Sequence, residues 1–523
     1  MSNKILRKTL PILLLTGLLS SCGGGYQIKE ADNAGGSAFY EIFVGSFCDS
    51  NGDGTGDLKG IESKLDYLKS LGVSNLWLTP IHPSPSYHKY DVKDYYDIDP
   101  KFGTMADFES LVSSAKTKGM GIIMDMVFNH TSVQSPWFDK FCEALKTNNT
   151  KSEYYDNYSW SEEYISGYAY NAKAGVNVEC NFDRNMPELN MDSKFVRAEL
   201  KKIQDFWLDK GVAGFRYDAV KYYYCDNYGG NIVGDTEKNV PLLKELADSA
   251  KAKKKDVYLV GENWVTDQEN INAYASSGMN MFNFPTAGVD GSGTAGEIVL
   301  NGGPKYFANA IESAQKGLLE ANPDADMCVF VSNHDTDRWG GFRNGHDHAE
   351  EARKVVASAY LLTPGTPFIY YGEEIQMLGQ RTSESTDAER RQAMVWNDDS
   401  ITCNQPEGFP VPKQVTKGVG ESEKDGWSML NHYRKVLSIR NTYKEVFRKG
   451  IFTAVETPER AVIFKIVSGN ETYYLAHNCV DKPLTLNLPD GLQILEEINV
   501  SQSSPSYASG ALTLQPYSSA FLR

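Results

Sequence analysis

The sequence predicts an α/β fold: a (β/α)8 TIM barrel with an excursion domain after its third strand and a C-terminal antiparallel β-sandwich. Eight short apolar runs recur along the chain, and helix-like stretches follow most of them. Parallel strands buried on both faces have this continuous apolar character, and their alternation with helices is typical of a barrel. The runs span residues 39–44, 75–79, 122–127, 212–217, 257–260, 281–284, 327–331 and 368–371.

Helical patterns, with apolar residues every three or four positions, lie between these runs. Together the strands and helices predict a barrel made of residues 37–130 and 186–441. The helices are clearest at 58–71, 105–118, 194–210, 240–253 and 349–361, and a last one is expected at 427–441.

Two segments depart from the alternation of strands and helices. Residues 131–185 are polar, rich in Tyr and Asn, and too many for an ordinary connection between a strand and a helix. We expect them to form the excursion domain beside the mouth of the barrel. Residues 442–523 alternate apolar and polar side chains in the manner of strands, which predicts the β-sandwich.

The N-terminus has the pattern of a processing signal. Basic residues precede an apolar stretch at 10–19, which is too short for an ordinary transmembrane helix. The following Leu-Ser-Ser-Cys resembles a bacterial lipobox, which implies a lipoprotein signal peptide at 1–21 and lipidation of Cys22. Residues 22–36 then read as a flexible tether. The expected location is outside the cytoplasm, on a bacterial membrane facing the cell surface or periplasm, although a plain secretory signal remains an alternative.

Charge and cysteine content restrict the partners. A formal net charge of −16 argues against binding nucleic acid, because a polyanion needs clustered Lys and Arg. The cysteines other than Cys22 lack metal-ligand spacing, and a Cys142–Cys180 disulfide is left open. We expect a monomer.

Three carboxylates lie just beyond strand-like runs: Asp218, Glu262 and Asp335. A fourth run, 121–130, ends in the same way with Asp125, Asn129 and His130. Side chains at the C-terminal ends of barrel strands converge on one mouth. Because gathering acids there costs free energy through repulsion of like charges, the pattern indicates acid, base or nucleophile chemistry.

Four segments resemble, in order and position, the conserved regions of the α-amylase family of glycoside hydrolases (family 13). The resemblance implies that Asp218 is the nucleophile, Glu262 the general acid/base and Asp335 the stabiliser of the transition state. The segments are Asp-Met-Val-Phe-Asn-His (125–130), Gly-Phe-Arg-Tyr-Asp-Ala-Val-Lys (214–221), Gly-Glu-Asn-Trp (261–264) and Ser-Asn-His-Asp (332–335).

The residues around these acids agree with the implied roles. Retaining hydrolysis of a glycosidic bond needs one ionised and one protonated carboxyl group, about 5–5.5 Å apart. Arg216 points to the same side of its strand as Asp218, so its positive charge favours the carboxylate. Partial burial and two neighbouring acids would raise the pKa of Glu262.

The resemblance also implies a set of substrate-binding residues. His130 and His334 would hydrogen-bond the sugar at the scissile bond, and Tyr90 would stack under it. Asp91 is expected to line the same pocket, and Arg216 is included for its place beside the nucleophile. Arg391 begins a segment, 391–396, that loosely resembles one of exo-acting glucosidases.

A second motif predicts a structural Ca²⁺ site. Oxygen-bearing residues alternate around a Gly-rich turn, which suits a hard cation that takes six to eight oxygen ligands. Gly60 stands where an EF-hand has its bidentate Glu, so we interpret the segment as the calcium loop after the first strand of amylase-like proteins. The ligands would be the side chains of Asp49, Asn51, Asp53 and Asp57 and the carbonyl of Thr55.

A further calcium between barrel and excursion domain stays open. Family members that bind one use the equivalent of Asn129 and a His where this chain has Tyr222.

The leading hypothesis is a surface-anchored, retaining α-amylase that acts on starch and maltooligosaccharides. The alternatives are an exo-acting α-glucosidase or oligo-1,6-glucosidase, and a maltooligosaccharide transglycosylase. A glycan-binding lipoprotein without activity is disfavoured because Asp218 and Glu262 are both present.

Overall fold

A computed structural model describes Gly25, Tyr26, Ile28 and residues 38–523, except 289–292, 301–302, 383–386, 398–399 and 407–416. The expected signal peptide (1–21), the lipidation site Cys22 and most of the tether (22–36) lie outside the described residues. Where the tether is described, it contacts the body of the protein. The N–H of Tyr26 donates to the carbonyl of Gly426 (3.0 Å), and its hydroxyl hydrogen-bonds Nδ1 of His432 (2.7 Å).

Eight parallel strands form the predicted barrel, and their order around it follows the chain. The main-chain N–H of Phe368 in β13 donates to the carbonyl of Val329 just after β12 (2.8 Å), which closes the barrel between these two strands. The TIM-barrel prediction is therefore confirmed. The strands are β1 (Phe39–Ile42), β2 (Asn75–Leu78), β3 (Gly121–Met126), β7 (Gly214–Tyr217), β10 (Tyr258–Gly261), β11 (Asn280–Phe282), β12 (Met327–Cys328) and β13 (Phe368–Tyr370).

Large aromatic side chains fill the middle of the barrel. Phe39 stacks on Phe368 with 4.6 Å between ring centroids, and Trp77 packs against both Phe368 and Phe282. Side chains alternate along a strand, so the next inward positions after Phe39 and Ile123 are Glu41 and Asp125. The barrel is thus apolar at its centre and charged toward the C-terminal ends of its strands.

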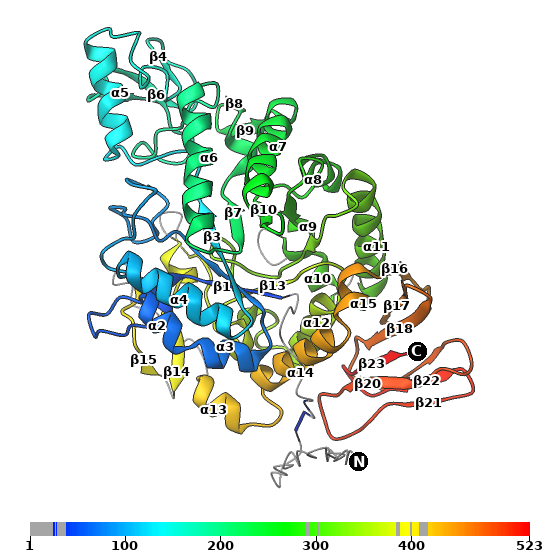
Figure 1. The fold of residues 1–523 in the computed structure, drawn as a ribbon. Helices are drawn as coiled ribbons and strands as arrows, with labels where there is room; N and C mark the ends of the chain where they lie inside the picture. Colours follow the sequence, from blue (N-terminus) through cyan, green and yellow to red (C-terminus); the bar gives the residue numbers. More distant parts are fainter. Residues whose placement is uncertain are drawn as a thin grey trace, which may run out of the picture.

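Helices surround the barrel (Figure 1). The single helix expected at 58–71 is interrupted at Lys64, and the one expected at 240–253 begins earlier because Asp235 caps it by accepting from the N–H of Lys238. The helix expected at 427–441 begins at Met429, after its cap Ser428. The main helices are α2 (Leu58–Ser63), α3 (Leu65–Leu71), α4 (Met105–Thr117), α6 (Lys194–Asp209), α7 (Thr236–Lys253), α8 (Gln268–Ala275), α11 (Gly303–Ala321), α12 (Ala349–Leu361) and α14 (Met429–Thr442).

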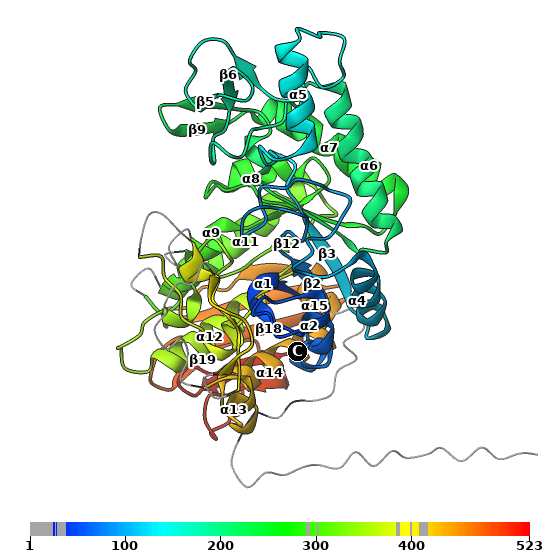
Figure 2. The ribbon, with the colours of Figure 1, turned by 90° about the vertical axis from the view of Figure 1, so that its left-hand side faces the viewer.

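The segment between β3 and α6 projects from one end of the molecule, opposite the end that carries α14 (Figures 1 and 2). It holds α5 (Pro136–Lys146) and a three-stranded antiparallel sheet in the order β4-β6-β5. The sheet strands are β4 (Trp160–Ser161), β5 (Tyr168–Asn171) and β6 (Val176–Glu179), and a hairpin of β8 (Cys225–Tyr228) and β9 (Asn231–Gly234) follows β7. Isolated bridges from His130 to Glu188 and from Tyr158 to Leu189 fasten this segment to the mouth of the barrel.

The C-terminal part forms two antiparallel sheets, as predicted, after the short helix α15 (Lys444–Lys449). Apolar side chains from both sheets, including Ile463, Leu486 and Leu512, pack into a core of their own. The larger sheet has the order β16-β17-β18-β23-β20, with strands Ile451–Ala454, Ala461–Ser468, Glu471–Asn478, Ser519–Leu522 and Ile494–Ile498; the smaller has the order β19-β22-β21, with strands Leu484–Asn487, Ala511–Leu514 and Ser506–Ala508.

Two open questions from the sequence concern cysteines and membranes. All seven cysteines of the described chain are free thiols, so Cys142 and Cys180 do not form a disulfide. Among the described helices, none has both the length and the apolar character needed to cross a bilayer.

Candidate active site

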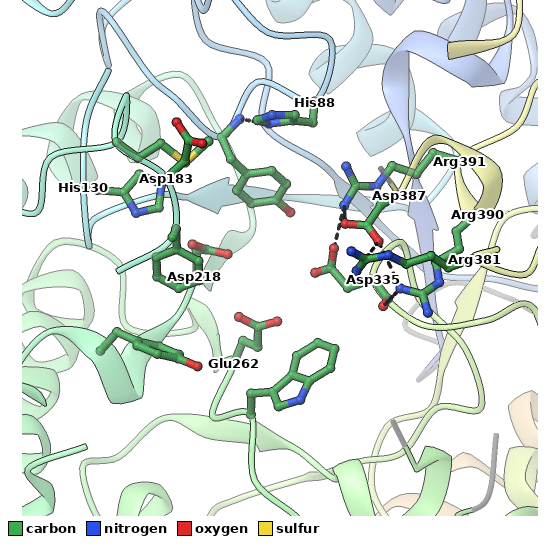
Figure 3. A pocket seen from close by; sticks show the side chains of 15 residues that line it. His88, His130, Asp183, Asp218, Glu262, Asp335, Arg381, Asp387, Arg390 and Arg391 are labelled. Atoms are coloured by element: carbon green, nitrogen blue, oxygen red, sulfur yellow. Dashed lines mark hydrogen bonds and ion pairs between the residues drawn. The ribbon is translucent and has the colours of Figure 1, made fainter. Parts of the chain in front are cut away.

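The predicted catalytic acids meet in one cavity of about 460 Å³ at the mouth of the barrel. Asp218 follows β7, Glu262 follows β10 and Asp335 lies in the loop after β12. Figure 3 shows their three carboxyl groups directed at the same open space. The lining residues are His88, Tyr90, His130, Phe182, Asp183, Met186, Asp218, Tyr222, Glu262, Trp264, Asp335, Arg381, Asp387, Arg390 and Arg391.

Arg216 binds carboxyl groups of the site but does not itself line the cavity. Its Nη1 lies 2.6 Å from carboxylate oxygens of both Asp125 and Asp218, and its Nη2 lies 3.0 Å from Oε1 of Glu262, an ion pair without hydrogen-bond geometry. The side chain is completely buried. The structure therefore places Arg216, expected among the substrate-binding residues, behind the cavity wall, where its guanidinium pairs with carboxylates.

Asp125 and Glu262 share this buried charge cluster, and each has a raised pKa. Burial raises the pKa of Glu262 to about 8, and the negative charges of Asp218 and Asp335 add to the effect against the opposing charge of Arg216. Burial likewise raises the pKa of Asp125 to about 6, although Arg216 opposes it. Glu262 is thus protonated at neutral pH, the state a general acid requires.

The backbone at Ala219 helps to hold Glu262. Ala219 has a left-handed conformation, with φ of +52°, which costs free energy for a residue with a Cβ. In this conformation its N–H donates to Oε2 of Glu262 (3.0 Å). The turn after β7 therefore ties the acid to the residue that follows the nucleophile.

The pH dependence of activity should report the proton on Glu262. We expect kcat/KM to fall tenfold for each pH unit above about 8, because the free enzyme then loses the proton that must be donated. Initial rates at low substrate concentration across pH 5 to 10 measure this limb, with stability checked at each pH. A limb that stays flat to pH 10 would contradict the assignment.

Asp335 is held ionised by two cations. Its Oδ1 lies 2.6 Å from Nη2 of Arg391, and its Oδ2 lies 3.0 Å from Nε2 of His334. Burial would favour the neutral acid, yet His334 and Arg391 hold the pKa of Asp335 far below its usual range. Arg391 lines the cavity, as predicted, and reaches Asp335 from the side shown at the right of Figure 3.

His334 does not line the cavity, although Tyr90 does. Nδ1 of His334 lies 2.6 Å from Oε1 of Glu41. Nε2 of His334 lies 2.6 Å from the hydroxyl of Tyr90 and 3.0 Å from Oδ2 of Asp335. The ring of Tyr90 stacks on that of His334, with 5.4 Å between centroids. The expected hydrogen bond from His334 to sugar is thus not supported, because both ring nitrogens already have partners.

Of His130 and Asp91, only His130 lines the cavity. His130 lines the cavity, and its Nε2 is buried without a hydrogen-bond partner in the described part of the chain. Burial lowers the pKa of His130, so the neutral ring is ready for a sugar hydroxyl. Asp91 does not line the cavity, because its Oδ1 turns away to accept from the hydroxyls of Ser84 (2.5 Å) and Ser86.

Sequence reasoning missed several cavity residues. Phe182, Tyr222 and Trp264 contribute aromatic rings to the lining, and Phe182 packs on Tyr222 with 4.8 Å between centroids. Trp264 stands two residues after Glu262 and was the one with a sequence signal. Arg390 and Asp387 come from the loop after β13, just before the segment 391–396, and no motif included them.

The predicted calcium loop has the right donor chemistry. Asp49 accepts from the N–H groups of Asn51, Gly52 and Gly54, while the side-chain oxygens of Asn51 and Asp53 accept from the N–H groups two residues on. These hydrogen bonds curve the loop, and the side-chain acceptors that make them are all oxygen atoms. Asp57 differs from the rest, since it caps α2 through Gly60 (2.6 Å) and also accepts from Ser50.

Another acid pair lies beside Asn129, where an interdomain calcium was left open. Oxygen atoms of Glu179 and Glu188 and the Cys225 thiol lie within 4.8 Å of one another, the closest gathering of such ligands in the described chain. The amide of Asn181 donates to both carboxyl groups, at 3.1 Å and 3.3 Å. Burial and the neighbouring Glu179 raise the pKa of Glu188 to about 8. The pair is therefore already bridged by an amide, and burial raises the pKa of Glu179 as well.

Known proteins resemble this chain over nearly its full length. Residues 41–450 match the family model described as the α-amylase catalytic domain. "Alpha-amylase 3" of Dictyoglomus thermophilum is 36% identical over 507 residues, which cover 95% of each chain, and an oligo-1,6-glucosidase of Parageobacillus thermoglucosidasius is 29% identical over 86% of this chain and 91% of its own. The solved structure of Amy13B of Eubacterium rectale superposes with a TM-score of 0.86 at 34% identity, covering 94% of this chain and 96% of that one.

Proposed function

This chain belongs to the α-amylase family of glycoside hydrolases, and we propose that it hydrolyses α-1,4-glucosidic bonds of starch and maltooligosaccharides with retention of configuration. One observation carries the proposal. Asp218 and Glu262 face one cavity while a single buried guanidinium, that of Arg216, binds both of their carboxyl groups. Two carboxyl groups in different protonation states are what double displacement requires.

In the proposed mechanism each step belongs to one carboxyl group. A carboxylate oxygen of Asp218 attacks the anomeric carbon while Glu262 gives its proton to the leaving oxygen, which departs as a free hydroxyl end. Glu262, now ionised, takes a proton from water, and that water displaces Asp218 from the sugar. Asp335, clamped by His334 and Arg391, lies where it can support the positive charge of the sugar in both transition states.

Endo and exo action are distinguished by products. We propose internal cleavage of long chains. The 36% identity with a protein named α-amylase, in an alignment that covers 95% of both chains, supports this proposal. A rapid fall in iodine staining of amylose, with maltooligosaccharides ahead of glucose, is the expected result. Early glucose from amylose and maltotriose, with iodine staining nearly unchanged, would instead favour an α-glucosidase or oligo-1,6-glucosidase. Longer oligosaccharides formed from maltotriose would favour a transglycosylase.

We propose that the loop from Asp49 to Asp57 binds Ca²⁺ as a structural ion. When bound, the ion would hold the loop after β1 in place. Chelation with EGTA should then lower the Tm by a few degrees, since a ligand that binds only the folded state stabilises it by mass action. The readout is differential scanning fluorimetry with and without Ca²⁺.

An Asp53→Asn variant should lose this Tm response, because it removes one ligand charge and keeps the side-chain acceptor. Asp94→Asn is the matched control, since Asp94 accepts from an N–H two residues on in the same way but lies outside the loop. An equal response of wild type and Asp53→Asn to EGTA would contradict the site.

We propose that the chain is a lipoprotein anchored through Cys22, because the Leu-Ser-Ser-Cys motif stands at the end of an apolar signal stretch. The test is partition of the full chain into the detergent phase when it is expressed in a bacterium, against Cys22→Ser. If both partition into the aqueous phase, the anchor is absent. Tyr26, four residues after Cys22 in the sequence, contacts Gly426 and His432, so the proposed anchor would lie close in the chain to the catalytic body.

A further inference from the structure

Glu41 is a charged residue inside the first, otherwise apolar strand of the barrel. All four residues of β1 are buried, and Glu41 is 1% exposed. It shares the inward side of the strand with Phe39, which packs in the apolar centre of the barrel. A buried carboxyl group is costly unless it is paired, so its partner indicates what it is for.

That partner is His334, through two contacts. Oε1 of Glu41 lies 2.6 Å from Nδ1 of the ring and accepts from the main-chain N–H of the same residue at 3.3 Å. The opposite ring nitrogen, Nε2, lies 3.0 Å from Oδ2 of Asp335. The three side chains thus form a row in which Glu41 and His334 are buried and Asp335 is partly exposed at the cavity.

The charges around His334 favour the imidazolium. Burial opposes it, but Asp335 and Glu41 raise the pKa of His334 to about 10. The other polar groups that face the ring are the Tyr90 hydroxyl and, at longer range, Asp125, while the guanidinium of Arg391 binds the His334 carbonyl (3.0 Å). Both ring nitrogens therefore carry protons: Nδ1 faces Glu41, and Nε2 faces Asp335 and the hydroxyl of Tyr90.

We propose that Glu41 is a positioning residue for the proposed glycosidase reaction: it keeps His334 charged and oriented so that His334 holds the Asp335 carboxylate in place. Asp335 then has one oxygen on His334 and the other on Arg391, which leaves it one orientation toward the sugar. Without the negative charge of Glu41, a neutral imidazole could present a lone pair to Asp335 and repel it. The proposal rests on the proposed function of this site.

Glutamine at position 41 separates this role from a merely structural one. Glu41→Gln keeps the shape and the carbonyl acceptor of the side chain but removes its charge, so a structural role would be rescued by it. We expect Glu41→Gln to lower kcat on maltooligosaccharides by about 10- to 100-fold, as for other residues that orient a catalytic group, with little change in KM. Glu41→Ala should be at least as impaired.

The matched control is Glu374→Gln. Glu374 is also fully buried near the barrel, and its Oε1 accepts from the hydroxyls of Tyr40 (2.7 Å) and Tyr67 (2.5 Å), yet it contacts none of the catalytic acids. It should retain the wild-type kcat. Circular dichroism and thermal unfolding identify any variant that fails to fold, and Glu41→Gln is the variant on which the conclusion depends.

A second readout does not use activity. In protein labelled with ¹⁵N-histidine, the His334 ring, assigned by its loss in His334→Gln, should show two protonated nitrogens at pH 8. In Glu41→Gln the same ring should become neutral at pH 8, whereas in Glu374→Gln it should stay charged.

The two readouts together decide the proposal. A Glu41→Gln protein with wild-type kcat, or with an unchanged His334 signal, would overturn it. The wild-type protein could fail to hydrolyse α-glucans and still show a charged His334 ring that becomes neutral in Glu41→Gln. That outcome would contradict the proposed function but leave the effect of Glu41 on His334 standing.

Discussion

Replacement of Glu262 by glutamine is expected to lower kcat on maltooligosaccharides by about 10³- to 10⁴-fold. Gln cannot donate a proton to the leaving oxygen, and it cannot later accept one from water. The side chain keeps its shape and can still accept from the N–H of Ala219, so the fold should be preserved. Purified variant and wild type are compared by release of reducing ends under saturating substrate.

The pattern across substrates identifies the role more sharply than the size of the loss. In an aryl glycoside with an acidic phenol, the phenol can leave without being protonated. The variant should therefore form the glycosyl-enzyme at nearly the wild-type rate, and this intermediate should accumulate. Azide needs no general base and should then restore turnover. Glu373→Gln is a suitable control, because Glu373 is buried and hydrogen-bonded to Ser332 and Tyr360 away from the cavity. Hydrolysis by Glu262→Gln at near wild-type rate would exclude Glu262 as the acid/base.

Replacement of Asp218 by asparagine should abolish turnover to at least about 10⁴-fold below wild type. A neutral amide is a poor nucleophile, and its loss of charge leaves Arg216 with two buried partners, Asp125 and Glu262, in place of three. That imbalance should favour ionised Glu262, so the acid is impaired as well. Aryl glycosides and azide should not rescue this variant, in contrast to Glu262→Gln.

Mass spectrometry provides the direct measurement. With a fluorinated glycoside that slows the second step, wild type should gain the mass of one sugar on the peptide that carries Asp218, and the Asn variant should gain none. Asp183→Asn is the matched control, since Asp183 lines the same cavity and makes no contact with Arg216. A sugar adduct on the Asp218→Asn protein would show that another residue is the nucleophile.

The barrel and its catalytic acids were predictable because each depends on local pattern. Apolar runs mark buried parallel strands, and Asp218 and Glu262 directly follow two of them, so the fold itself places both at the mouth. The proposed calcium loop likewise rests on spacing along one turn. Helix boundaries were less predictable, as at Thr236, because a cap such as Asp235 depends on a single side-chain hydrogen bond.

The substrate-binding set was less predictable, because lining a cavity is a property of several segments at once. His334 and Asp91 carry polar groups near the mouth, but Glu41 engages the first and two serines engage the second. Phe182, Asp387 and Arg390 reach the cavity from the excursion segment and from the loop after β13. No periodicity in the sequence marks such residues.

The sequence by itself determined the order of strands, the identity of the acids and hence the class of bond chemistry. Only the tertiary structure decided which charged groups surround these acids and thus which of the acids have shifted pKa values. Arg216 was expected to favour the carboxylate of Asp218, yet it also binds Asp125 and Glu262, and a Glu from β1 pairs with a His after β12. The physical reason is that pKa values and side-chain orientation depend on burial and on charges a few ångströms away, and those neighbours come from strands far apart in the chain.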